Sequence, residues 1–401
     1  MSASLFASVE MAPRDPILGL NEQFQADANP NKVNLGVGVY TDENGKLPLL
    51  ACVKEAENLL AETPKPRGYL PIDGIPAYDQ AVQSLVFGAG SQVLGAGRVV
   101  TAQALGGTGG LKLGADFLKR LRPNARVLIS DPSWENHRAL FEAAGFDVGT
   151  YPYYDAQQRG IAFDATLAAL AQAEAGTIVV LHACCHNPTG YDLDATQWQQ
   201  LIEVVKSRAL VPFLDMAYQG FGEGIAEDGA VVQQFVASGL DFFVATSFSK
   251  SFSLYGERVG ALSIVCASRE EAARVQSQIK RVIRTNYSNP PTHGAQVVAL
   301  VLNTPALRAQ WEQELATMRE RIRAMRVALV ERLKAHGVTA DLGFITRQKG
   351  MFSYSGLNAE QMARLRDEYG IYGVSSGRIC VAALNGNNVD YVAQAMAAAM
   401  R

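Results

Sequence analysis

Cysteine is scarce in this chain of 401 residues, which contains five. They are Cys52, Cys184, Cys185, Cys266 and Cys380, and four of them stand in apolar stretches. A disulfide framework pairs its cysteines and belongs to an oxidising compartment, so an odd number in apolar surroundings argues against one. We therefore expect reduced thiols and a cytoplasmic protein.

Long hydrophobic runs and an excess of one charge are also absent. The longest apolar stretches have the length of a strand, so we expect no membrane span and no membrane partner. The residues Met1–Phe6 lack the basic start and apolar core of a secretory signal. The net charge is -3 and the basic residues are scattered, which argues against a nucleic-acid partner.

The chain does have enough apolar material for a large core, with 48% hydrophobic and 19% charged residues, and its length suggests about two domains. Apolar stretches of strand length alternate with helical stretches between residues 99 and 265. This alternation predicts an α/β fold whose sheet is mostly parallel and covered by helices on both faces. After residue 337 the pattern predicts a smaller α/β unit.

The predicted elements follow from apolar periodicity and from turn residues at their ends. The strands are expected at residues 99–105, 126–130, 145–151, 177–181, 211–214, 242–245, 259–265 and 377–382. The helices are expected at residues 49–62, 75–87, 111–120, 165–173, 195–207, 231–238, 272–284, 305–336 and 359–369. Residues 33–40 contain alternating glycines, which indicate either a strand with a bulge or a close approach of backbone to something bulky.

The segment Thr246–Arg258 carries the strongest chemical signal. It follows the apolar run Phe242–Ala245, and it places Lys250 at the end of a buried strand. A lysine there needs an anionic partner, a lowered pKa or a covalent role, and lysine is the residue that forms Schiff bases with carbonyl compounds. Ser247 and Arg258 are residue types that bind phosphate. A purely structural lysine is the alternative.

A glycine-rich turn, Gly106–Gly110, stands between a predicted strand and a predicted helix. That layout aims backbone N–H groups at a phosphate. The turn lacks the glycine of a dinucleotide fingerprint, because Lys112 stands there, and it lacks the Gly-Lys of a P-loop at Leu111 and Lys112. It therefore suits a phosphate other than that of NAD or an NTP, or else it is a turn without a ligand.

Polar or aromatic side chains also follow three other predicted strands. They are Trp134, which suits ring stacking or the core, Asn187, and Asp215 with Tyr218 after it. In open α/β sheets the ligand binds beyond the carboxyl ends of the strands, so these residues are expected to converge with Lys250. This set of groups predicts a pyridoxal phosphate (PLP) pocket: an indole, an amide, an acid, a phenol and an amine beside a turn that suits a phosphate.

Two further features are ambiguous in the sequence. His182 and His186 flank two cysteines, but positions four apart on an extended strand lie about 13 Å from each other, too far for one zinc ion. We therefore expect no metal. Arg378 opens a strand after Ser376-Gly377, where it suits either carboxylate capture or the surface.

The motifs together resemble those of the class I aminotransferases, and within them the bacterial aspartate and aromatic (tyrosine) aminotransferases. The resemblance covers essentially the whole chain and is carried by Val33–Tyr40, Gly106–Gly109, Asp131–His137, Cys184–Gly190, Asp215–Phe221, Ser247–Lys250 and Ser376–Arg378. It implies the type I fold of PLP-dependent transferases and a homodimer with shared active sites. It also implies a large PLP-binding domain at residues 46–310, and a small domain that combines residues 311–401 with residues 1–45, including an N-terminal arm.

The resemblance also implies a role for each matching residue. Lys250 would hold PLP covalently and then move a proton as a free amine, Asp215 would pair with the ring nitrogen, and His137 would support Asp215. The other cofactor contacts would come from Trp134 on the ring, from Asn187 and Tyr218 on the ring oxygen, and from Gly107, Thr108, Ser247, Arg258 and the partner subunit's Tyr69 on the phosphate. Catalytic roles would fall on Lys250, Asp215, Tyr218 and Tyr69.

Substrate recognition is implied in the same way. Arg378 would bind the α-carboxylate near Gly38, Trp134 and Asn187, and Arg284 from the partner would bind the side-chain carboxylate of a dicarboxylic substrate. The segments Leu70–Gly74, Phe352–Ser355 and Ile379–Asn385 resemble the aromatic branch. Val39, Thr108 and Asn289 resemble the aspartate branch instead.

We therefore expect an enzyme that transfers the amino group of tyrosine, phenylalanine or aspartate to 2-oxoglutarate in a PLP-dependent ping-pong cycle. Three alternatives stay open: an aspartate aminotransferase with little aromatic activity, a PLP-dependent lyase, and a non-enzymatic PLP-dependent regulator. The regulator would need a DNA-binding domain, for which the chain has no spare segment.

Overall fold

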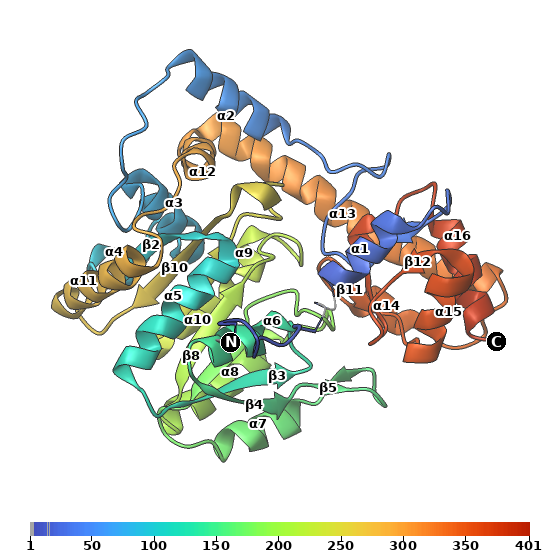
Figure 1. The fold of residues 1–401 in the computed structure, drawn as a ribbon. Coiled ribbons are helices and arrows are strands. Elements are labelled where there is room, and N and C mark those ends of the chain that lie inside the picture. The colour runs from blue at the N-terminus through green and yellow to red at the C-terminus, as the bar shows by residue number, and fades with distance from the viewer. Residues whose placement is uncertain (1–3, 14, 16) are drawn as a thin grey trace.

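A computed structural model describes residues 4–13, 15 and 17–401 and shows a seven-stranded sheet at the centre of the larger lobe (Figure 1). The strand order is β2-β10-β9-β8-β7-β3-β4, and β10 runs antiparallel to both of its neighbours. The other strand pairs of the sheet are parallel. The seven strands are β2 (Val99–Leu105), β3 (Arg126–Asp131), β4 (Asp147–Pro152), β7 (Ile178–His182), β8 (Val211–Met216), β9 (Phe242–Ser247) and β10 (Val259–Val265).

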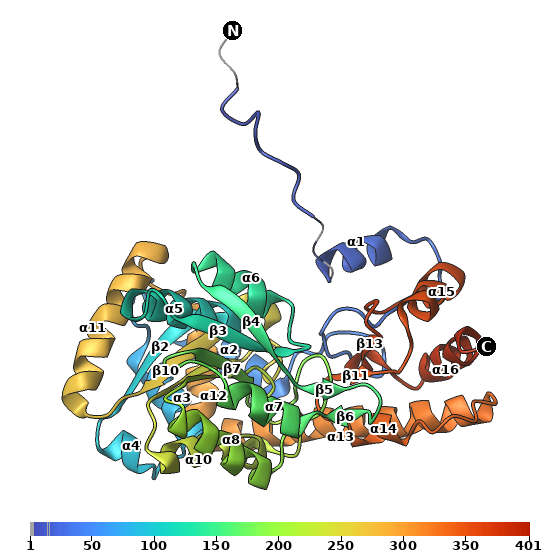
Figure 2. The ribbon, with the colours of Figure 1, turned by 90° about the horizontal axis from the view of Figure 1, so that it is seen from below.

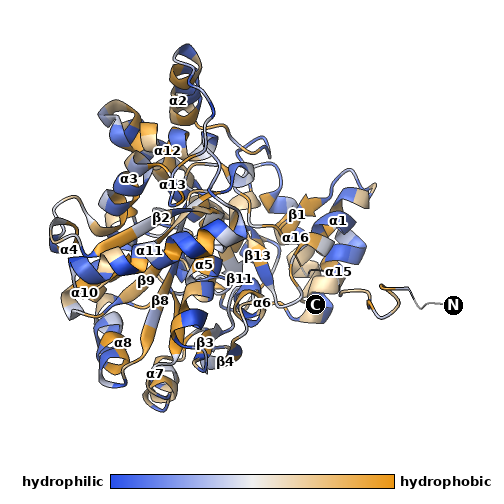
Figure 3. Ribbon diagram, turned by 60° about the vertical axis from the view of Figure 1, so that its left-hand side comes forward, coloured by the Kyte–Doolittle hydropathy of each residue, from blue (hydrophilic) through white to orange (hydrophobic). Residues whose placement is uncertain are grey.

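Helices cover both faces of this sheet, as the alternating sequence pattern predicts. One face packs against α5 (Gly106–Leu121), α6 (Asn136–Ala143) and α11 (Arg269–Asn286). The other packs against α3 (Pro76–Phe87), α7 (Phe163–Ala171), α8 (Ala195–Ser207) and α10 (Ala230–Ser238). Figure 3 shows the central strand β8 as hydrophobic, whereas the covering helices carry both hydrophilic and hydrophobic residues. The fully buried strands β7, β9 and β10 fit a sheet that faces no solvent.

The long helix α13 (Pro305–Ala335) connects this lobe to a second, smaller one (Figure 1). At its start α13 packs against α2 (Ala51–Glu62) and α12 (His293–Asn303), and further along it packs against α14 (Gly343–Arg347) and α16 (Val389–Ala399). The smaller lobe also holds α1 (Leu18–Ala26), α15 (Ala359–Tyr369), and the strand pairs β1 (Val33–Asn34) with β12 (Ile371–Tyr372) and β11 (Phe352–Tyr354) with β13 (Arg378–Cys380). The expected domain boundary at residues 310 and 311 lies inside α13.

The remaining elements are short. They are α4 (Gln92–Gly95), α9 (Ile225–Asp228), the hairpin of β5 (Tyr154–Asp155) and β6 (Gly160–Ile161), and the 3-10 turns η1 (Tyr255–Glu257) and η2 (Val381–Ala383). Residues 4–13 are exposed and extend away from the body of the molecule (Figure 2). None of the described helices combines the length and the apolar character that a membrane crossing requires.

Helices α1, α6, α12, α14 and α16 were not predicted, and two glycine-containing segments also differ from the sequence prediction. Within residues 33–40 the strand comprises Val33 and Asn34 alone, because Asn34 turns the chain by accepting hydrogen bonds from the backbone of Gly36 and Val37. The glycine run Gly106–Gly110 is the first part of α5 rather than a separate turn. Glycine is required at Gly110 because α5 lies close against β10: a Cβ there would lie 2.7 Å from the Ala261 carbonyl oxygen.

Candidate active site

A cavity of about 320 Å³ opens at the carboxyl ends of the central strands. It lies between the large sheet and the segments around residues 17–18, 37–39, 352 and 378. Eleven residues expected in the site line it: Gly38, Gly107, Thr108, Trp134, Asn187, Asp215, Tyr218, Ser247, Lys250, Arg258 and Arg378. The convergence inferred from strand ends is therefore present in the structure.

Lys250 lies in the turn after β9, with its Nζ 5.0 Å from the centre of the Tyr218 ring. Burial lowers the pKa of its amine to about 8, with a further lowering from Arg258 and an opposing effect of Asp215. At pH 7 about a tenth of such amines are neutral, compared with fewer than about one in a thousand for an ordinary lysine. The environment thus raises the fraction of the uncharged amine, which is the form that acts as a nucleophile or a base.

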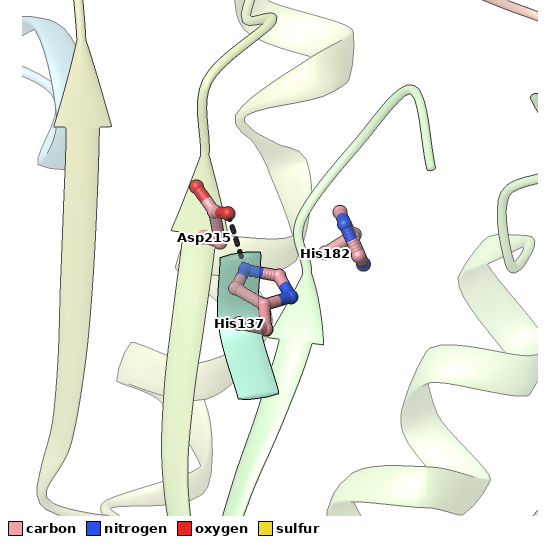
Figure 4. Close-up of side chains that lie close together, drawn as sticks. All are labelled: His137, His182 and Asp215. Atoms are coloured by element: carbon pink, nitrogen blue, oxygen red, sulfur yellow. Dashed lines mark hydrogen bonds and ion pairs between the residues drawn. The ribbon is translucent and has the colours of Figure 1, made fainter. Parts of the chain in front are cut away.

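Asp215 is the next-to-last residue of β8 and is held by a hydrogen-bonded chain (Figure 4). Its Oδ2 lies 2.8 Å from Nε2 of His137, and Nδ1 of His137 lies 2.8 Å from Oγ of Ser133. Burial by itself raises the pKa of the Asp215 carboxyl, but the hydrogen bond and charge of His137, together with His182 and Lys250, lower it below the ordinary value. Asp215 is therefore a fixed anion at neutral pH.

His182 stands beside Asp215, in register with it on the neighbouring strand β7. Burial, with the charge of His137, lowers the pKa of His182 to about 3, so its ring is neutral. Neither ring nitrogen has a hydrogen-bond partner among the described residues, although both are buried. The ring forms part of the cavity wall.

The expected separation of His182 and His186 is wrong. Their ring centres lie 4.2 Å apart, not about 13 Å, because β7 ends at His182 and the chain turns at Cys185, whose φ is 51°. A zinc site is still poorly supported by the donor set. Both nitrogens of His186 already lie within 2.9 Å of Ser130 Oγ and Thr189 Oγ, and both nitrogens of His137 are bonded as described above.

The glycine end of the cavity forms a cradle for an anion. Gly107 and Thr108 belong to the first turn of α5, whose N–H groups have no partner within the helix. Arg258 faces them in a left-handed backbone conformation with φ of 56°, and a Cβ at Gly106 would lie 2.4 Å from its Nη2. Ser247 and Ser249 add hydroxyl groups to the same wall. These donors suit a phosphate group.

Arg378 forms the opposite side of the cavity and is 3% exposed, so the surface alternative for this residue is wrong. Its Nη1 donates to Asn187 Oδ1 at 3.1 Å, and its Nη2 donates to the Gly36 carbonyl oxygen at 2.7 Å. The guanidinium carbon lies 4.4 Å from the centre of the Phe352 ring. Its buried Nε has no partner among the described residues, which leaves a donor for a ligand.

These side chains fit PLP. Asp215 offers an anion to the ring nitrogen of the cofactor, Lys250 offers an amine, and the start of α5 offers a cradle for the phosphate. Trp134 lies in the same wall and packs edge-on against His137, with ring centres 5.2 Å apart. Tyr69 and Arg284 are not part of the cavity of one chain. Tyr69 is 94% exposed, and exposed Arg284 donates a hydrogen bond from Nη1 to Ser288 Oγ.

Several residues that line the cavity were not predicted as site residues. They are Ile17, Leu18, Val37, Val39, Leu111, Glu135, His182, Ala217, Ser249, Tyr255 and Phe352. Ser249 and Tyr255 lie within the segment Thr246–Arg258, so their position in the sequence was a usable signal. The apolar ones carry no chemical signal in the sequence, and the tertiary structure alone places them here.

The fold and the site are those of a PLP-dependent aminotransferase, and the comparison with protein families agrees. The chain matches the family model of aminotransferases of class I and II over residues 30–396, and it belongs to that family. It is therefore an aminotransferase with the expected fold. The lyase alternative finds no support among its relatives, which are named as aminotransferases.

Some of the similar proteins are named as aspartate aminotransferases and others as aromatic-amino-acid aminotransferases. An aspartate aminotransferase of Pseudomonas aeruginosa is 66% identical over 98% of this chain and 99% of its own length. An aromatic-amino-acid aminotransferase of Escherichia coli is 51% identical over 99% of this chain and 100% of its own. The crystal structure of an aromatic-amino-acid aminotransferase from Burkholderia pseudomallei, covalently bound to pyridoxal phosphate, matches with a TM-score of 0.98 and 67% identity, covering 100% of both chains.

Proposed function

We propose that this protein transfers the amino group of an aromatic amino acid or of aspartate to 2-oxoglutarate in a ping-pong cycle that uses PLP. The observation that carries the proposal is that Lys250, Asp215 and Arg378 all line the same cavity. The PLP bound in the similar structure from Burkholderia pseudomallei supports the choice of cofactor. Five cysteines, all free and buried, support a reducing, cytoplasmic location.

The residues of the large sheet would hold the cofactor. When bound, PLP supplies an electron sink for the negative charge that develops on the substrate Cα. Asp215 would accept a hydrogen bond from the ring nitrogen and keep it protonated, and Asn187 and Tyr218 would bond the ring oxygen. Trp134 would stack on the ring, and Gly107, Thr108, Ser247 and Arg258 would hold the phosphate. Lys250 would attach the cofactor and later, as a neutral amine, carry the α-proton.

Arg378 would hold the substrate, next to Gly38. Every amino acid and 2-oxo acid substrate shares the α-carboxylate, and a guanidinium binds it with two parallel hydrogen bonds. Gly38 lets Phe352 approach, because a Cβ at Gly38 would lie 2.6 Å from Cζ of that ring. This side of the cavity is otherwise apolar, with Ile17, Val37 and Val39, which suits an aromatic side chain.

A homodimer would complete the site with Tyr69 and Arg284 of the partner subunit. Both residues are exposed in one chain and lie outside its cavity. The N-terminal segment supports a partner, because Leu5, Phe6, Val9 and Met11 are each at least 70% exposed. We further propose the domain division at residues 46–310 against 1–45 with 311–401, with α13 as the continuous connection.

Arg284→Ala is expected to lower kcat/KM for aspartate and for 2-oxoglutarate about 100-fold, roughly 2.7 kcal/mol, and to leave phenylalanine as amino donor within a few-fold. The reason is that the second carboxylate loses its cation, whereas the aromatic ring needs none. The half-reactions are measured separately. Arg281→Ala, an exposed arginine one turn earlier in α11, serves as the control. Equal losses for aspartate and phenylalanine would contradict the assignment.

The substrate class is tested by comparing kcat/KM for phenylalanine, tyrosine and aspartate, with 2-oxoglutarate as acceptor. We expect all three donors to react, within about 100-fold of one another. A preference for aspartate of about a thousandfold, roughly 4 kcal/mol, would show an aspartate aminotransferase with little aromatic activity. Ammonia as the product in place of glutamate would reveal a lyase.

A further inference from the structure

Arg326 differs from the other arginines of α13. Arg308, Arg319, Arg321, Arg323 and Arg332 each form an ion pair with an acidic side chain. Arg326 is 2% exposed and forms no ion pair with any described residue. A buried charge without a counter-ion is costly unless hydrogen bonds satisfy it. What Arg326 bonds to therefore indicates what it is for.

Its hydrogen bonds converge on one short segment, Gly350–Ser353. Nη2 donates to the carbonyl oxygens of Gly350 at 2.7 Å and Phe352 at 2.6 Å, and Nε donates to Ser353 Oγ at 3.2 Å. Charge-assisted hydrogen bonds from a planar guanidinium are strong and directional. Arg326 thus ties the middle of α13 to the start of β11.

The segment that Arg326 holds is also the support of Arg378. Strand β11 pairs with β13, which places Tyr354 opposite Arg378 and Phe352 opposite Cys380. The Phe352 ring lies against the Arg378 guanidinium and packs edge-on against Tyr218, with ring centres 6.0 Å apart. The turn before it packs on the Asn187 loop, because a Cβ at Gly350 would lie 2.5 Å from Cβ of Cys185. A shift of this segment would therefore move three walls of the cavity together.

We propose that Arg326 is a positioning residue for substrate binding: by fixing Gly350–Ser353 it holds Phe352 under Arg378 and thereby sets the affinity for the substrate α-carboxylate. The inference rests on the proposed function, in which Arg378 binds that carboxylate. Arg326 itself does not line the cavity, so it acts through Phe352. Most of the cofactor contacts come from the large sheet, so PLP binding is expected to depend on this segment less than substrate binding does.

Arg326→Met is expected to raise KM for phenylalanine and the dissociation constant of succinate each about 10-fold, with kcat within about twofold. Succinate is the probe because it offers carboxylates without an amino group, and its binding is followed as the rise in melting temperature it causes. The dissociation constant of PLP, titrated into cofactor-free protein by absorbance, is expected to stay within about twofold. Ser353→Ala removes one hydrogen bond and is expected to raise KM about twofold. This variant replaces Arg326→Met in the test if Arg326→Met does not fold.

Arg323→Met is the matched control, because Arg323 lies one turn earlier in α13 and also donates to a backbone carbonyl, that of Gly222, outside the cavity. It is expected to leave KM and succinate binding unchanged. Arg326→Lys separates geometry from charge, and it is expected to restore only part of the affinity. Full restoration by lysine, or a lowered melting temperature with unchanged KM and succinate binding, would overturn the inference. A wild-type enzyme that transaminates none of the proposed donors would instead refute the proposed function.

Discussion

Lys250→Ala is expected to abolish the absorbance band of covalently bound PLP and to lower kcat at least about 10⁴-fold, roughly 5.5 kcal/mol. In the proposed function, the substitution removes the amine that attaches the cofactor and that carries the α-proton. Its environment is built for this purpose, because burial lowers the pKa of the amine to about 8. The measurements are an absorbance spectrum of the purified protein and single-turnover kinetics with phenylalanine.

Lys206→Ala is the control for this experiment, since Lys206 is an exposed lysine whose Nζ donates to the Ser238 carbonyl oxygen. It is expected to keep both the absorbance band and the activity. The variant Lys250→Ala is expected to bind PLP without a covalent bond, because the phosphate cradle and Asp215 are intact. Near-normal turnover in Lys250→Ala would remove the basis of the proposed function.

Asp215→Asn is expected to lower kcat about 10³-fold, roughly 4 kcal/mol, with a much smaller change in substrate KM. The amide keeps the shape of the carboxylate but not its charge, so the ring nitrogen is no longer held protonated. The pKa of the Asp215 carboxyl is depressed in the folded protein, through His137, His182 and Lys250 acting against burial. The charge is therefore present throughout the neutral range and is lost only on strong acidification.

Asp164→Asn, at an exposed carboxylate in α7, is the control and is expected to behave as the wild type. A cofactor analogue with a permanent positive charge on the ring nitrogen, N-methyl-PLP, is expected to restore part of the activity of Asp215→Asn. That rescue would not occur if Asp215 served the fold alone. An unchanged kcat in the variant would refute the assigned role of this residue.

Much of the large sheet was predictable from the sequence because its elements are long and their periodicity is strong. Helix α8 and helix α15 begin and end at the expected residues, and each has a capping box at its start. The two-residue strand β1 was not predictable, because the side chain of Asn34 rather than a periodic pattern ends it. Likewise, only the structure shows that the glycine run is the start of a helix that packs closely on β10.

The sequence by itself determined which groups are proposed to do the chemistry: an amine, an acid, an indole, a phosphate cradle and an arginine, each placed near the end of an element. Strand ends predict convergence because parallel strands present their carboxyl ends at one edge of the sheet. Only the tertiary structure decided how closely side chains meet, as the rings of His182 and His186 with centres 4.2 Å apart show, and which apolar side chains close the cavity. It also revealed the contacts that link Arg326 to Phe352 and Phe352 to Arg378, because contacts between residues distant in sequence follow from packing and leave no local pattern.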